Sequence, residues 1–274
     1  MKVNPSMLPM LLAAVILALA IKGEGYACSD STLSGTYLYR LSGLTYKGNA
    51  AINTTAATVG FTAVGLMRLN GLGGGSGAES VSNAGVLSNR SFTPSYQVNP
   101  DCTATINLSY CPLEHCAGQV QSLPNLLVAN DGSQANFLNT VPDTSILGEI
   151  WQVPDGGCSP ESVVGTYRFM TQGSGMNGHG NAMTTASSVA FGSSGFLRLN
   201  SDGTLVANDI AAFGGLILPR KQESSWFIRS DCSGGFIASP LANGTDIYVA
   251  PGGGQFVLLN AFSGTIVSGV YRKQ

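Results

Sequence analysis

Short apolar runs recur along the chain, and each is broken within a few residues by Gly, Asn, Asp or Pro. The runs are rich in Val, Ile, Tyr, Phe and Thr, and no stretch beyond the first 27 residues sustains the 3.6-residue period of an amphipathic helix. This pattern predicts an all-β protein. In the first half of the chain the expected strands cover residues 37–41, 56–62, 66–69, 85–88, 95–98, 104–108, 126–128, 135–139 and 147–151.

Eight or nine strands in such a length favour a closed antiparallel β-barrel. Closure removes the unpaired sheet edges, which a protein with few charged side chains could not otherwise protect. A β-sandwich is the alternative, because both architectures point every second residue of a strand inward.

An internal repeat divides the chain into two domains. Gly35-Thr36-Tyr37 recurs 130 positions later as Gly165-Thr166-Tyr167, and the same shift superposes Arg68-Leu69-Asn70 on Arg198-Leu199-Asn200. Beyond Cys102 the shift falls to 121, and over the last strand it falls to 120, where Ile150-Trp151 would match Val270-Tyr271. We therefore expect a first barrel over residues 28–153 and a second over residues 154–274.

The repeat also selects a disulfide pattern from the fifteen that six cysteines allow. Only four of the cysteines have a counterpart in the other copy, so we expect one equivalent bridge in each domain. The remaining two lie in an insertion of the first copy and are expected to pair with each other. The predicted bridges are Cys28–Cys102, Cys158–Cys232 and Cys111–Cys116.

The first residues have the pattern of a signal peptide. Lys2 precedes a stretch of 14 apolar residues that is too short to span a bilayer, and small residues follow it up to Ala27. We expect residues 1–27 to be removed as a signal peptide. The signal peptide and the expected disulfides both predict a secreted, periplasmic or cell-surface protein. No later stretch is long enough for a membrane span.

Charged residues make up only 10% of the chain, and the formal net charge is -2. Nucleic acid is excluded as a partner because no cluster of Lys and Arg is present to neutralise phosphates. Such a weakly charged surface also lacks the repulsion that keeps proteins apart, so self-association is an open alternative.

Several of the repeated residues carry a resemblance. The order Gly35-Thr36-Tyr37, Phe61 with Gly65, Leu69-Asn70 and then Asp101-Cys102 resembles that of uncharacterised secreted bacterial proteins with repeated Gly-rich β domains. These are similar in outline to the small barrels of the allene oxide cyclase and dirigent type. The resemblance implies a barrel, and it supplies no catalytic residue.

The sequence contains no constellation typical of catalysis. The two histidines, His115 and His179, have no counterparts in the other copy, and the cysteines lack the paired spacing of a zinc site. The Gly-rich turns precede strands instead of helices, which argues against a phosphate-binding loop. We therefore expect no metal and no cofactor, and we favour a protein that is not an enzyme.

Two arginines stand alone in otherwise apolar strands, Arg68 and its counterpart Arg198. If Met67 and Leu69 fill the core, Arg68 faces solvent and is structural, which is the favoured interpretation. In the alternative, Arg68 with Asn70 and Arg198 with Asn200 point inward and bind the polar end of an apolar ligand.

These observations predict a secreted, non-enzymatic barrel protein that binds small apolar or amphipathic molecules. A subunit of an extracellular matrix or fibre is one alternative. A cyclase or isomerase of a lipid-like substrate, steered by Arg68 and Arg198, is the other.

Overall fold

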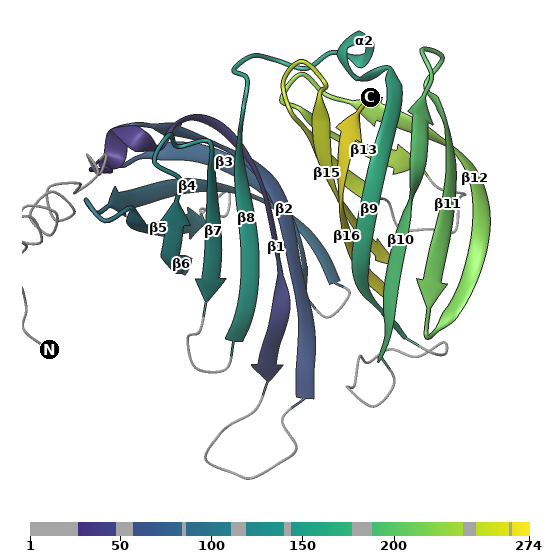
Figure 1. The fold of residues 1–274 in the computed structure, drawn as a ribbon, viewed down its shortest axis with the longest axis horizontal. Coiled ribbons are helices and arrows are strands. Elements are labelled where there is room, and N and C mark those ends of the chain that lie inside the picture. Colours follow the sequence, from purple (N-terminus) through teal and green to yellow (C-terminus); the bar gives the residue numbers. More distant parts are fainter. Residues whose placement is uncertain are drawn as a thin grey trace, which may run out of the picture.

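A computed structural model describes residues 27–47, 57–83, 86–110, 119–139, 144–176, 188–237, 245–262 and 265–274. The described chain forms two closed antiparallel barrels of eight strands each, so the expectation of tandem barrels is confirmed and the sandwich alternative is wrong. Figure 1 shows the barrels side by side, with β1 and β2 of the first next to β15 and β16 of the second.

Each barrel runs up and down, and its last strand pairs with its first. The first barrel consists of β1 (Ser34–Lys47), β2 (Ala57–Asn70), β3 (Gly75–Asn83), β4 (Val86–Val98), β5 (Thr103–Tyr110), β6 (Gln119–Val128), β7 (Gln134–Asn139) and β8 (Thr144–Val153). The second consists of β9 (Gly165–Met176), β10 (Ser188–Leu199), β11 (Thr204–Phe213), β12 (Leu216–Ile228), β13 (Ser233–Ile237), β14 (Thr245–Val249), β15 (Gln255–Phe262) and β16 (Thr265–Lys273). Short helices η2 (Asp30–Thr32) and α2 (Pro160–Val163) precede the two barrels.

The observed strands are longer than the apolar runs of the sequence. The runs at 56–62 and 66–69 belong to one strand, β2, because Gly65 does not end it. A Cβ atom at Gly65 would lie 2.6 Å from the hydroxyl of Tyr39, so this glycine makes room for a core side chain instead of forming a turn. Strand β3 was not expected, since its sequence, GSGAESVSN, contains no apolar run.

The last strand of the second barrel has a different register from the one expected. Tyr39 pairs with Ile150 in the first barrel, and its counterpart Phe169 pairs with Tyr271 in the second. Ile150 therefore corresponds to Tyr271, and the shift stays at 121 instead of falling to 120. The expected alignment was wrong by one residue, which would have turned every side chain of this strand to the opposite face.

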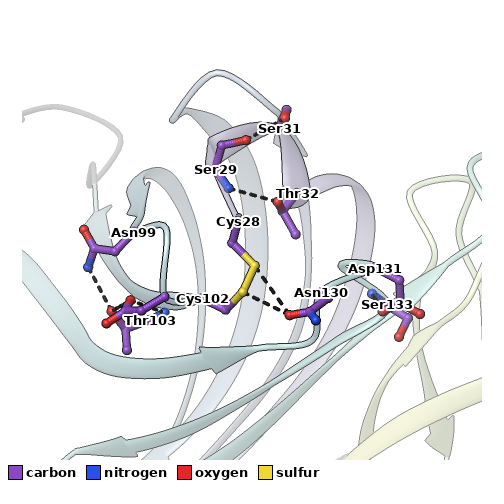
Figure 2. The surroundings of a disulfide bond; sticks show 11 residues. Cys28, Ser29, Ser31, Thr32, Asn99, Cys102, Thr103, Asn130, Asp131 and Ser133 are labelled. Carbon is purple, nitrogen blue, oxygen red and sulfur yellow. Dashed lines mark hydrogen bonds between the residues drawn. A yellow bond between two sulfur atoms is a disulfide. The ribbon is translucent and has the colours of Figure 1, made fainter. Parts of the chain in front are cut away.

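The two expected disulfides that lie in the described residues are present. Cys28–Cys102 and Cys158–Cys232 each join positions 74 residues apart. Figure 2 shows the first bridge beside Asn130, whose side-chain oxygen lies 3.1 Å from the Cys102 Sγ. Cys111 and Cys116 lie outside the described residues, as do residues 1–26 of the predicted signal peptide.

Both bridges sit at equivalent ends of their barrels. Asp101 and Asp231, which precede the second cysteine of each bridge, accept hydrogen bonds of 3.0 Å from the backbone N–H of Thr103 and Ser233. At the same end of the second barrel, Tyr167 donates to the carbonyl oxygens of Val163 and Gly253 at 2.7 and 2.8 Å. These contacts fasten α2 and a turn across that end.

The barrels share an apolar interface. The outward side chains of Leu38, Val64 and Leu66 are at most 7% exposed, because β1–β3 pack against β14–β16 of the second barrel. Val257 and Leu259, which point out of the second barrel, are 1% and 0% exposed on the other side of this contact. The two barrels thus use different strands to meet each other.

The helices in the described part of the chain are all too short or too polar to cross a membrane.

Candidate ligand-binding cavity

The second barrel encloses a cavity of about 650 Å³. Its wall is largely aromatic and aliphatic, and its lining residues come from strands β9 to β16. The aromatic side chains of the lining are Phe169, Phe191, Phe213, Phe236 and Tyr271. A volume of this size and such a wall are typical of sites for small molecules.

An ion pair lies in the wall of the cavity. Arg220 Nε donates to Asp209 Oδ1 at 3.1 Å, and Arg220 Nη2 donates to Asp209 Oδ2. The Asp209 side chain is 3% exposed and that of Arg220 is 33% exposed. Strands β11 and β12 place the two residues opposite each other, so their pairing follows from the register of one hairpin.

The lining also contains Glu223, which is exposed and pairs with Lys221, and several uncharged polar groups. The hydroxyls of Thr171 and Ser193 lie 2.8 Å apart and are hydrogen-bonded to each other. The side-chain oxygen of Asn260 is buried and has no hydrogen-bond partner among the described residues. A ligand that donates a hydrogen bond would satisfy this oxygen.

Tyr271 lies within a stack of rings at the inner wall. Its ring centroid is 4.4 Å from that of Phe256 and 4.8 Å from that of Phe169. Burial, with a further contribution from the Asp209 carboxylate, raises the pKa of Tyr271 well above its ordinary value. The phenol is therefore neutral at physiological pH.

The first barrel has an equivalent ion pair in a filled interior. Glu79 and Arg90 occupy the positions of Asp209 and Arg220, and Arg90 Nη2 donates to Glu79 Oε1 at 2.6 Å. The hydroxyl of Tyr39 donates to Glu79 Oε2, also at 2.6 Å. The guanidinium of Arg90 lies over the ring of Tyr110, with its Cζ 4.0 Å from the ring centroid.

Three substitutions explain why the second barrel is hollow. The interior positions of Leu41, Phe92 and Phe137 in the first barrel, each at most 4% exposed, hold smaller or polar side chains in the second. The replacements are Thr171, Gln222 and Leu258, and all three line the cavity.

The structure places the four sequence-predicted ligand residues on the outside of the barrels. Met67 and Leu69 are buried in the core, so Arg68 and Asn70 face outward, and Arg198 does so in the second barrel. Arg68 Nη2 donates to the carbonyl of Gly156 at 3.3 Å. The inward alternative for these residues is therefore wrong, and the structural interpretation of the arginines holds.

The asparagines of this set stabilise turns. Asn70 Oδ1 accepts hydrogen bonds from the backbone N–H groups of Leu72 and Gly74, at 2.8 and 3.0 Å. Asn200 Nδ2 donates to the hydroxyl of Thr204 at 3.0 Å. Neither residue lines the cavity.

Comparison with protein-family models and with curated proteins finds no match. Within the described residues, no group of three or more His, Cys, Asp and Glu side chains is placed to hold a metal ion. His115 and His179 lie outside the described residues.

The ion pair of each barrel was not predicted as a site, although a signal for it exists. Arg90 and Arg220 are identical under the shift of 130, and Glu79 and Asp209 are both acidic under the same shift. A charged pair repeated in both copies and brought together by one hairpin is the pattern that points to them.

Proposed function

We propose that this is an exported, non-enzymatic protein that binds a small, largely apolar molecule with a neutral polar end in its second barrel. The observation that carries the proposal is the 650 Å³ cavity, which exists where the first barrel has a packed core. The side chains around a cavity lack the van der Waals contacts that a filled core provides, and this absence lowers the stability of the barrel. A bound ligand can supply those contacts.

The aromatic wall supports an apolar ligand. Burial of apolar surface stabilises a complex by roughly 25 cal/mol per Å² before the costs of association. Edge-to-face and stacked contacts with rings such as Phe169 and Tyr271 add to this.

The ion pair supports a neutral polar end. Asp209 binds two nitrogens of the Arg220 guanidinium and neutralises its charge, and the remaining charged residue of the lining, Glu223, is acidic, so the wall has no free cation to offer an anion. Burying a ligand carboxylate beside Asp209 would cost desolvation without a free cation in return. A hydroxyl or carbonyl can instead use Arg220 Nη1, Asn260 or the Thr171–Ser193 pair.

The two disulfides are compatible with an oxidising, extracytoplasmic compartment, which supports export. The exposed positions of Arg68 and Arg198 give no support to a cyclase or isomerase steered by these residues.

Filling the cavity tests the proposal. The double variant Thr171→Leu, Leu258→Phe transfers two core residues of the first barrel into the second. We expect it to weaken binding of the neutral probe N-phenyl-1-naphthylamine by at least about tenfold, or about 1.4 kcal/mol. Fluorescence titration measures the affinity. Ser225→Phe, which adds a ring at an exposed position on the outer side of β12, is the matched control and should bind normally. A filled variant that binds as well as wild type would contradict the proposal.

The neutral polar end has its own test. In competition against the same probe, wild type should bind 1-decanol at least about tenfold more tightly than decanoate. Asp209→Asn frees the charge of Arg220 and should reverse this preference. The fold should survive, because a third of the Arg220 side chain is exposed and water can solvate it.

Glu149→Gln removes one negative charge from an exposed position on β8 and is the control for net charge. An equal gain in decanoate affinity in both variants would show that the ion pair does not select the ligand. Loss of binding to every probe would instead contradict the cavity itself.

A further inference from the structure

The contact between the barrels joins two different faces. The first barrel uses the outer side of β1–β3, and the second uses the outer side of β14–β16. The barrels are copies of one fold. The first barrel therefore has strands equivalent to β14–β16, and the second barrel has strands equivalent to β1–β3. These two counterpart faces lie on β6–β8 of the first barrel and on β9–β11 of the second.

The first counterpart is an exposed patch of three leucines, here named the leucine face: Leu127, Leu138 and Leu147. Their exposed fractions are 63%, 45% and 62%. Leu138 and Leu147 are paired across β7 and β8, and Leu127 lies diagonally from Leu138 on β6.

In the second barrel the positions equivalent to the leucine face are buried by the contact with the first barrel. They are Tyr248, Leu259 and Ser268, which are 6%, 0% and 1% exposed. The leucine face therefore repeats a surface that this protein already uses for packing one barrel against another.

The second counterpart is also apolar and is named the β10 face: Met170, Phe196 and Ile210. Their exposed fractions are 66%, 50% and 61%. Met170 and Ile210 flank Ser194 in the sheet, and a hollow of about 580 Å³ lies between Phe196, Ile210 and Pro219. Leu66 and Ser80, the first-barrel equivalents of Phe196 and Ile210, are 7% and 1% exposed within the intramolecular contact.

The charges on the two faces have opposite signs. Among the described residues of β6–β8 the one charged side chain is Glu149, which is 48% exposed and whose Oε2 lies 3.7 Å from Nη2 of Arg40 on β1. The outward charges of β9–β11 are the exposed arginines Arg168 and Arg198. The two arginines disfavour a contact of the β10 face with itself and favour a partner face that carries a carboxylate.

We propose that the leucine face of one copy of this protein packs on the β10 face of another, repeating the contact between the barrels. Such a contact is heterologous, because each copy keeps one face of each kind free. It therefore continues from copy to copy and produces a ring or a filament. The inference is independent of ligand binding in the cavity.

Analytical ultracentrifugation at rising concentration tests the assembly. Wild type should form species larger than dimers, whereas Leu138→Asp and Ile210→Asp should each be monomeric, because each has lost one face. Leu72→Asp is the matched control, since Leu72 is 86% exposed on a turn outside both faces, and this variant should assemble like wild type.

Mixing the two blocked variants distinguishes this geometry from a symmetric one. Leu138→Asp retains the β10 face and Ile210→Asp retains the leucine face, so an equimolar mixture should form one-to-one dimers that grow no further. Wild type that stays monomeric at all concentrations would overturn the proposal. So would dimers formed by either blocked variant alone.

Discussion

Replacing Cys158 and Cys232 by alanine is expected to lower the free energy of unfolding of the second barrel by about 4 kcal/mol. The bridge closes a separation of 74 residues, and removing it restores conformational freedom to the unfolded chain. This loss is a large part of the roughly 5 to 15 kcal/mol that stabilises a typical domain. We expect the second barrel to have a lower free energy of unfolding than the first, because its interior is partly empty.

Urea unfolding followed by Trp226 fluorescence measures this effect. Trp226 is 6% exposed in the second barrel and donates its indole N–H to the carbonyls of Asn200 and Thr204. A Trp151→Phe background leaves Trp226 as the single tryptophan. The matched control replaces Cys28 and Cys102, whose separation is also 74 residues, and should act on the first barrel. A loss below about 1 kcal/mol for the Cys158–Cys232 variant would contradict the prediction.

Removing the carboxylate of Glu79 should have the second largest effect, a loss of about 3 kcal/mol in the first barrel for Glu79→Ala. The Glu79 side chain is 1% exposed and accepts hydrogen bonds from both Tyr39 and Arg90. Without it, the buried phenol of Tyr39 has no acceptor, and Arg90, whose side chain is 29% exposed, loses its carboxylate partner. Burial and the neighbouring carboxylate raise the pKa of Tyr39, so this phenol remains a donor that needs a partner.

The equivalent change in the second barrel provides the comparison. Asp209→Ala should cost less, about 1 kcal/mol, because the cavity gives water access to the freed Arg220. Thermal and urea unfolding of both variants measure the difference. An equal loss of unfolding free energy in the two barrels would contradict the idea that the filled core makes removal of Glu79 more destabilising.

The repeat in the sequence was sufficient to predict two equivalent β domains and the bridges Cys28–Cys102 and Cys158–Cys232. It could not predict the register of the last strand. The apolar pair at 146–147 matches the apolar pair at 266–267 under a shift of 120, whereas the observed shift of 121 places Leu147 on Ser268, so the sequence favours the wrong alignment. Only the pairing of Ile150 with Tyr39, and of Tyr271 with Phe169, distinguishes the two alignments.

The cavity also could not be predicted from the sequence pattern. Alternation shows which residues point inward, but cavity volume depends on side chains that meet from strands far apart in the chain. Thr171 and Leu258 are 87 positions apart in sequence and line the same cavity. The ion pairs were not predicted for a different reason: Arg90 and its carboxylate partner Glu79 are 11 residues apart, and only the pairing of β3 with β4 brings them together.

The unequal filling of the two barrels bears on how such a protein can evolve. In a single barrel, every interior substitution changes both the stability of the fold and the shape of any cavity inside it. Here the first barrel keeps a complete core and supports the second through a shared apolar face. Mutations at Thr171 or Gln222 can then change the shape and polarity of the cavity while the other copy keeps its packed core. Duplication thus lets the interior of one copy vary while the other copy preserves a complete core.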